Sequence, residues 1–243
     1  MDGNMIPLSI KDTFQFSCSE QVPCFNECCQ DLNQFLTPFD ILRLKQHLNL
    51  PSNLFLERYT SQHTGPETGL PVVTLKPDHS QHLTCPFVTS KGCRVYENRP
   101  ASCRTYPLVR MAARSRETGK ISEQYFLLKE PHCLGFYQVQ TQTVQQWVTD
   151  QGLNVYNQMN DMLMEIIGLK NRLMSGRLDT KSTFLFNMAC YDLDTFRSHI
   201  FDRGILHNDS IDPDALDKAK HDDVALLKLG FKWIKDTIFK NGT

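Results

Sequence analysis

The sequence lacks the features that mark membrane-spanning and nucleic-acid-binding proteins. No run of about 18 apolar residues occurs in the chain, which excludes a conventional transmembrane helix. Lys and Arg (26) nearly cancel Asp and Glu (27), so we expect neither nucleic acid nor an anionic membrane as a partner. Residues 1–16 lack the basic start and apolar segment of a secretory signal, and we therefore expect a cytoplasmic protein.

Motifs of several enzyme classes are missing as well. The chain contains no GxGxxG, no P-loop, no HExxH and no GxSxG pattern. Its acidic residues at 192, 194, 202, 222 and 223 fit the first turns or the solvated faces of helices better than acid–base catalysis. The sequence therefore favours a binding protein over an enzyme.

The chain is rich in cysteine. Nine are present, and eight of them lie within the first 133 residues. A reducing compartment disfavours disulfides, whereas thiolates are soft ligands that suit zinc, copper(I) and iron–sulfur centres. Eight thiolates can fill two tetrahedral sites, or one site with spare thiols. The predicted metal ligands are Cys18, Cys24, Cys28, Cys29, Cys85, Cys93, Cys103 and Cys133.

The spacing of these cysteines does not identify the metal. No pair has the C-x2-C spacing of a zinc ribbon, and the closely spaced run of bacterial ferredoxins is missing too. The neighbours Cys28 and Cys29 are expected to point in different directions and to serve different metals. Cys190 stands beside Ala189 in a helical pattern and is predicted to be a buried thiol outside the ligand set.

The distribution of cysteine and proline predicts an α+β protein, mostly α, with two regions. Residues 14–137 form a small, loop-rich cysteine-cluster domain whose own core is thin. Thr37-Pro38-Phe39-Asp40 predicts a helix start, because Thr caps free N–H groups and Pro suits the first helical position. A second helix begins at Pro51-Ser52. Short strands are expected over residues 72–75, 125–128 and 83–87.

Residues 141–243 predict a C-terminal helical region. Apolar residues recur at helical spacing in about three stripes, which indicate amphipathic helices. Gly152 is expected to interrupt the first stripe and Gly176 to end it, while Asp212-Pro213 is a start signal for the third. We expect these helices to pack on each other or against the cysteine-cluster region.

The residues around the cysteines resemble those of a known family. The matching segments are Phe16-x-Cys18, Cys24-x3-Cys28-Cys29, Leu36-Thr37-Pro38-x-Asp40-Ile41-x-Arg43-Leu44, Cys85-Pro86-Phe87, Cys93-Arg94-Val95-Tyr96-Glu97-Asn98-Arg99-Pro100-x-x-Cys103-Arg104-Thr105-Tyr106-Pro107 and His132-Cys133-x-Gly135-Phe136. They are similar to the CxxCxxxCC cysteine-cluster family (YkgJ-like), which is described as zinc- or iron-chelating. One departure is the gap of five residues after Cys18, where the family name implies two.

The resemblance implies a zinc or iron cofactor, with a [4Fe–4S] cluster as one form of the iron. Its role is structural or redox-active. An alternative is an iron–sulfur-dependent protein-modifying enzyme or subunit, since one group resembling the family methylates flagellin lysines. Another is a zinc-stabilised module that binds a protein partner. No catalytic residue carries over from the resemblance.

Charged side chains near the cysteines could support such a centre. Arg94, Arg99 and Arg104 could offset the negative charge of a thiolate centre, or could be ordinary surface or capping residues. Three histidines, His79, His82 and His132, could replace a cysteine ligand, although surface positions are expected for them. Tyr96 and Tyr106 are expected to pack around the centre.

Overall fold

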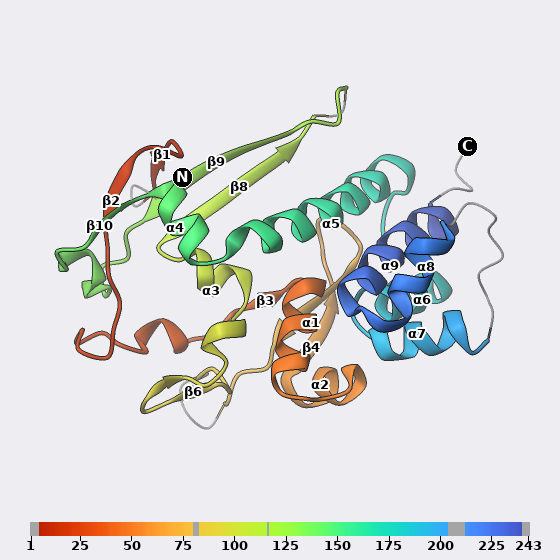
Figure 1. Ribbon diagram of the computed structural model, residues 1–243, viewed down its shortest axis with the longest axis horizontal. Helices are drawn as coiled ribbons and strands as arrows, with labels where there is room; N and C mark the ends of the chain where they lie inside the picture. Colours follow the sequence, from red (N-terminus) through yellow and green to blue (C-terminus); the bar gives the residue numbers. More distant parts are fainter. Residues whose placement is uncertain (1–4, 80–82, 116, 204–211, 240–243) are drawn as a thin grey trace. The chain divides into compact units, whose positions relative to one another are not determined.

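The computed structural model describes residues 5–79, 83–115, 117–203 and 212–239 of the chain. His82, a candidate replacement ligand, lies outside these residues. The structure is mostly helical with small sheets of two or three strands, which confirms the predicted α+β class (Figure 1). Among the described residues, no helix combines the length and apolarity needed to cross a membrane.

The chain divides into two compact units, and each is assembled from two separate segments. The first, which we call the cysteine unit, comprises Met1–Gln34 and Pro77–Asp161. The second, the helical unit, comprises Phe35–Lys76 and Met162–Thr243. Residues 35–76 thus pack with the C-terminal helices, whereas the sequence analysis grouped them with the cysteines.

A three-stranded antiparallel sheet forms one part of the cysteine unit. Strands β8 (Leu108–Arg114) and β9 (Ile121–Leu128) form a long hairpin, and β1 (Met5–Leu8) pairs with the other edge of β9. The predicted strand at 125–128 is therefore the second half of β9. The hairpin partner β8 was not expected from the sequence.

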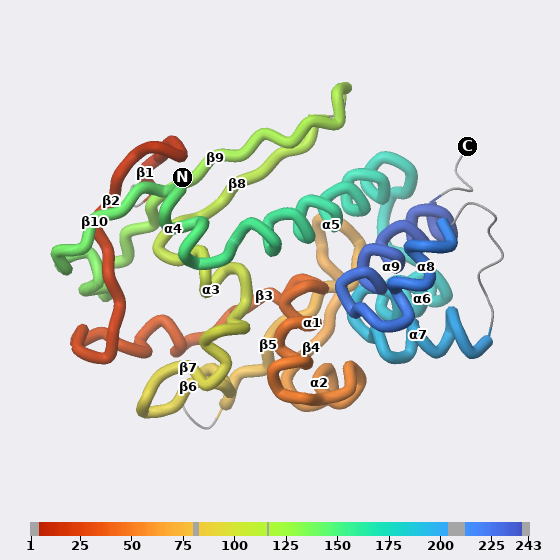
Figure 2. The backbone as a smooth tube through the Cα atoms, viewed as in Figure 1, coloured from red at the N-terminus to blue at the C-terminus, as the bar shows by residue number. Residues whose placement is uncertain are grey.

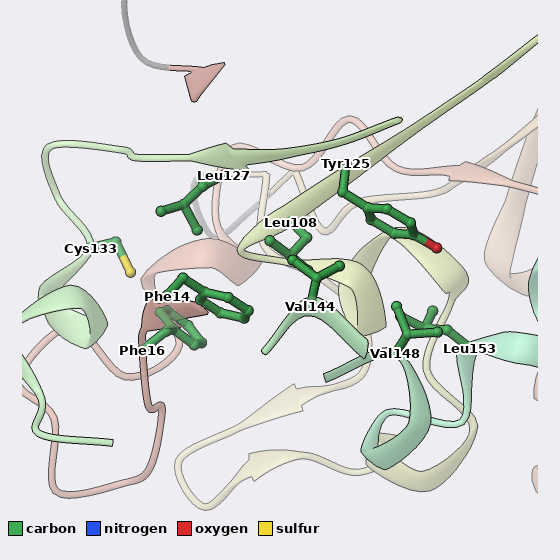
Figure 3. Close-up of a cluster of buried hydrophobic side chains, with 9 residues drawn as sticks. All are labelled: Phe14, Phe16, Leu108, Tyr125, Leu127, Cys133, Val144, Val148 and Leu153. Carbon is green, nitrogen blue, oxygen red and sulfur yellow. The ribbon is translucent and has the colours of Figure 1, made fainter. Parts of the chain in front are cut away.

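A core cluster of the cysteine unit, drawn in Figure 3, packs against this sheet. Its buried members are Phe14, Phe16, Leu108, Tyr125, Leu127, Cys133, Val144, Val148 and Leu153. Phe16 is at its centre, since its ring lies within 5.3–5.8 Å of the rings of Phe136, Trp147 and Tyr106. One of the eight clustered thiols, Cys133, therefore belongs to the core itself.

The remaining elements of the cysteine unit are short. They are β2 (Thr13–Gln15), η1 (Glu27–Cys29), β6 (Val88–Thr89), β7 (Gly92–Cys93), η2 (Tyr96–Asn98), α3 (Ala101–Thr105), η3 (Leu134–Tyr137), β10 (Thr141–Thr143) and α4 (Val144–Asp150). Two-residue strands β6 and β7 turn back on each other, as the tube in Figure 2 shows. The strand predicted at 83–87 is wrong: only Thr84 makes an isolated bridge, to Asp78, and Leu83 has a positive φ of 55° that a strand does not allow.

Two helices and a small sheet open the helical unit. Helix α1 (Pro38–His47) begins as predicted, because Thr37 accepts the N–H of Asp40 while the Asp40 carboxylate accepts the N–H of Thr37. Helix α2 (Ser52–Tyr59) also begins where the sequence predicts. The sheet has the order β3 (Phe35–Leu36), β5 (Pro71–Leu75) and β4 (Thr60–Thr64).

Each of the three apolar stripes in the C-terminal region is shared by two consecutive helices. The pairs are α4 with α5 (Leu153–Leu173), α6 (Thr180–Cys190) with α7 (Leu193–Phe201), and α8 (Pro213–His221) with α9 (Asp223–Ile238). Gly152 separates the first pair with a φ of +61°, as its position predicts. Asp192 and Asp222 cap α7 and α9, which confirms the helix-start interpretation of these acidic residues.

Candidate metal centre

All eight candidate cysteines lie in the cysteine unit, on its irregular segments. Four come from the first segment of the unit, where Cys28 and Cys29 form the turn η1. In the second segment, Cys85 precedes β6, Cys93 ends β7, Cys103 lies in α3 and Cys133 immediately precedes η3. The cysteines are therefore positioned by loops and single turns.

Backbone hydrogen bonds bring the cysteine-bearing segments together. The N–H of Cys85 donates to the carbonyl of Cys29 at 2.8 Å. The N–H of Leu134 donates to Cys24 Sγ at 3.1 Å, which places Cys24 beside the segment of Cys133. Residues more than 50 positions apart in sequence thus meet at the cysteines.

A glycine permits one of these approaches. A Cβ at Gly135 would come 2.6 Å from the Phe16 ring and 2.9 Å from the carbonyl oxygen of Ser17. Ser17 donates its N–H to the carbonyl of Gly135 at 3.1 Å. Only glycine allows the two strands of chain to lie this close, and the contact holds Cys133 next to the segment that carries Cys18.

The eight thiols lie near enough to interact through their charges. Partial burial and the thiols of Cys28, Cys24 and Cys133 raise the pKa of Cys18 to about 11. Burial raises the pKa of Cys85 to about 11, and the neighbouring Cys93 and Cys28 add to the shift. The thiols of Cys28, Cys85 and Cys103 all contribute to the raised pKa of Cys29. Every member of the predicted set is thus linked electrostatically to at least one other member.

Cys28 and Cys29 influence each other's protonation. The Cys29 side chain is the main cause that lowers the pKa of Cys28 to about 7, and the Cys28 side chain raises the pKa of Cys29. Both residues lie on the turn η1, in which the N–H of Cys29 donates to the carbonyl of Asn26. That the two cysteines serve different metals stays a prediction.

Backbone N–H groups favour the thiolate form of three cysteines. The N–H of Phe87 acts on Cys85, that of Val95 on Cys93 and that of Gly135 on Cys133. Each contact lowers the pKa of a thiol that burial raises. In all three the donor is two residues after the cysteine, and hydrogen bonds of this kind tune metal-bound sulfur.

The three arginines divide into two roles. The positive charge of Arg99 lowers the pKa of Cys18 and of Cys93, and Arg94 also lowers that of Cys93. Arg99 is buried, and its guanidinium donates to the Tyr96 carbonyl at 2.6 Å and stacks 3.7 Å from the centre of the Tyr96 ring. These two arginines thus provide positive charge to the thiols, as the sequence suggested.

Arg104 has the capping role that the sequence left open. Its guanidinium donates to the carbonyls of Arg99, at 3.1 Å, and of Gln151, at 2.8 Å, and also to that of Glu97. These bonds fix the turn between η2 and α3 and so position Cys103. Gln151, which accepts from Arg99 and Arg104, gave no signal in the sequence because it is distant along the chain.

The two candidate histidines that the structure describes lie on the surface. His79 and His132 are exposed, and His132 Nε2 is 3.7 Å from a carboxylate oxygen of Glu130. Gln34 was not among the candidates but contacts one of the thiols, with its Oε1 atom 3.6 Å from Cys103 Sγ.

Cys190 is separate from the group, as predicted. Its side chain has no exposed surface and lies at the end of α6 in the helical unit. Burial alone raises its pKa well above the ordinary value, with no contribution from another cysteine. This thiol packs as a small apolar side chain.

The donor set fits zinc or iron in its chemistry, although the side chains do not converge as they stand. Among the described residues, no three His, Cys, Asp or Glu side chains are arranged to hold a metal ion. A metal site rarely exists in an unfolded chain, so metal binding and the ordering of the ligands are coupled. The eight thiols, the N–H groups and the arginine charge supply what a thiolate centre needs, and binding would have to draw the sulfurs inward.

The model of a protein family matches this part of the chain. Residues 17–134 match the model of the CxxCxxCC family, described as a "Putative zinc- or iron-chelating domain". This segment of the chain is therefore similar to that family. No curated protein and no solved structure shows a detectable similarity to the chain.

The matched segment, residues 17–134, contains all eight candidate cysteines and ends just after Cys133. Cys190 lies outside it, in agreement with its burial in the helical unit. The gaps of five and three residues that precede Cys24 and Cys28 are both longer than the two residues in the family name. The structure nevertheless keeps Cys18 within the range of three other thiols.

Proposed function

We propose that the segment matched by the CxxCxxCC family model binds zinc or iron through the eight cysteines of the cysteine unit, and that the metal stabilises this unit. The observation that carries the proposal is the gathering of eight sequence-distant thiols into one mutually interacting group. Thiolates of like charge gain nothing from this proximity, since the charge of each neighbour raises the pKa of a thiol such as Cys18 or Cys29. Bound metal ions would remove that penalty, because each ion stabilises the thiolates that ligate it.

A stabilising role follows from the construction of the cysteine unit. Its core cluster has nine buried members, and the cysteines lie on loops and short elements outside the three-stranded sheet. Metal–thiolate bonds would join these segments, and the binding free energy would then contribute to folding. Bound zinc would supply structural linkage alone, whereas bound iron would add electron transfer.

The experiment is to purify the whole chain without oxygen and to measure its metals, acid-labile sulfide and absorption spectrum. Stoichiometric zinc in colourless protein would support a structural centre. Brown protein with iron and sulfide would support an iron–sulfur centre and a redox role. Protein that retains neither metal and binds neither Zn²⁺ nor Fe²⁺ when these are added would contradict the proposal.

A further inference from the structure

Two separate sets of hydrogen bonds hold the cysteine-bearing segments of the cysteine unit. The first set joins the segment that contains Cys18 and Cys24 to the segment that begins at Cys133. Cys24 Sγ accepts the N–H of Leu134, the residue after Cys133, at 3.1 Å. Ser17, which precedes Cys18, donates its N–H to the carbonyl two residues after Cys133 at 3.1 Å. Cys18, Cys24 and Cys133 are therefore gathered on one pair of adjoining segments.

The second set joins the turn η1 to the hairpin of β6 and β7. The N–H of Cys85 donates to the Cys29 carbonyl at 2.8 Å. Cys93 pairs with Val88 in the hairpin, and the N–H of Val88 donates to the Cys85 carbonyl at 3.1 Å. These backbone contacts connect Cys29, Cys85 and Cys93 and involve no residue of the first set.

Cys103 is joined to the second set by the segment that follows η1. Gln34 Oε1 lies 3.6 Å from Cys103 Sγ. Two residues before Gln34, the N–H of Leu32 donates at 3.0 Å to the carbonyl of Leu83, which is two residues before Cys85. The segment after η1 therefore lies against α3, which carries Cys103, and against the chain that leads to Cys85.

The number of ligands in a centre assigns the remaining cysteine, Cys28. This residue lies in η1 between the two sets, and its thiol raises the pKa of Cys18 and of Cys85, so it is close to both. A structural zinc site takes four ligands, and a [4Fe–4S] cluster takes four cysteines. The second set already contains four thiols, whereas the first contains three. Cys28 therefore completes the first set.

We propose that the eight cysteines form two centres of four thiolates each, one for each set of hydrogen bonds. The first centre contains Cys18, Cys24, Cys28 and Cys133, and the second contains Cys29, Cys85, Cys93 and Cys103. This inference rests on the proposed function and gives the number and composition of its sites. The neighbours Cys28 and Cys29 then belong to different centres, and each centre can be lost without the other.

The test counts the zinc that the whole chain retains in competition with a chelator. The wild type should retain two zinc ions per chain. Cys133→Ser and Cys85→Ser should each retain one, because they remove ligands of different centres, and the combination of both should retain none. Cys24→Ser combined with Cys133→Ser changes the first centre alone and should still retain one. Cys190→Ser is the control and should retain two, since this thiol is buried in the helical unit.

Cys28 is tested by adding Cys28→Ser to a variant of each centre. Added to Cys133→Ser, it should leave the remaining ion in place, because the first centre is already lost. Added to Cys85→Ser, it should remove the remaining ion. The reverse pattern would overturn the assignment of Cys28 to the first centre.

The wild type provides a measurement that does not depend on the folding of any variant. With Cd²⁺ in place of Zn²⁺, ¹¹³Cd NMR should show two resonances in the region typical of four sulfur ligands. A single resonance, one zinc ion per chain in the wild type, or loss of all zinc in Cys24→Ser combined with Cys133→Ser would overturn the two-centre assignment. A wild type that binds no metal would contradict the proposed function itself, and this result is distinct from the others.

Discussion

The cysteine unit holds eight thiols within range of one another's charges, whereas the helical unit holds one thiol, Cys190, that is fully enclosed by side chains. The first group lies on loops and single turns. The second thiol ends a helix, α6, next to a close helix contact, since a Cβ at Gly230 of α9 would come 2.5 Å from the Ala189 carbonyl oxygen. The same residue type is a candidate ligand in one setting and an apolar filler in the other.

The units also differ in how they hold charge. The helical unit buries Lys45, which lies 3.2 Å from Asp194 and 3.5 Å from Asp223, and so it neutralises this buried charge with its own carboxylates. In the cysteine unit the thiols have only partial compensation, from Arg99 and Arg94. The comparison teaches that the helical unit supplies the counter-charges of Lys45 itself, while under the proposed function a bound cation would supply those of the thiols.

Removal of the metal should give the largest difference between the units. We expect chelation to lower amide protection in the cysteine-bearing segments by about a hundredfold or more, because metal binding is coupled to their folding. Protection in α6, α7 and α9 should change little. Hydrogen exchange followed by mass spectrometry, with and without chelator, measures both units in one sample. An equal loss of amide protection in the two units would contradict the proposed difference between them.

Lys45→Met should give the next largest effect, a loss of stability that is confined to the helical unit. The substitution leaves Asp194 and Asp223 without their buried cation, and we expect a loss of about 2 kcal/mol, since Asp194 is partly exposed and Arg197 still pairs with Asp223. Chemical denaturation measures this loss in the free energy of unfolding. As a control, Lys220→Met removes an exposed pair with Asp217 and should cost well under about 1 kcal/mol. Equal losses in the two variants would show that burial of Lys45 has no energetic importance.

Cys190→Ala should separate the two kinds of cysteine. It leaves a small cavity in a closed core, so we expect a loss of about 1 kcal/mol in the free energy of unfolding and full metal content. Cys93→Ala removes a candidate ligand and should lower metal content. Metal analysis and denaturation of both variants test the contrast. Metal loss in Cys190→Ala would contradict the assignment of this thiol to packing.

The smallest expected effect is a dependence of the helical unit on pH. Burial raises the pKa of Asp194, but hydrogen bonds from Ser52 and the charge of Lys45 outweigh it, so the pKa is lowered overall. The stability from this carboxylate is therefore present above the ordinary pKa of about 3.9 and is lost as the pH falls through the folded value. Thermal unfolding of the wild type and of Asp194→Asn between pH 7 and about pH 3 measures how this contribution to stability depends on pH. The two curves should converge at the acid end; parallel curves would contradict the assignment.

Local signals in the sequence predicted much of this structure. Thr37 and Asp40 predicted the start of α1, and Gly152 predicted the break between α4 and α5, because caps and glycine act within a few residues. The helical setting of Cys190 predicted its burial.

Features that depend on long-range contacts could not be predicted in this way. Gln34 contacts Cys103, 69 positions away, and Lys45 pairs with Asp194, 149 positions away, and neither pair has a local pattern.

The most direct test of the central claim is X-ray absorption spectroscopy at the zinc edge of zinc-loaded protein. If the cysteines are the ligands, the first shell should consist of sulfur at about 2.3 Å. A shell of nitrogen or oxygen at about 2.0–2.2 Å, without sulfur, would contradict a cysteine-ligated centre.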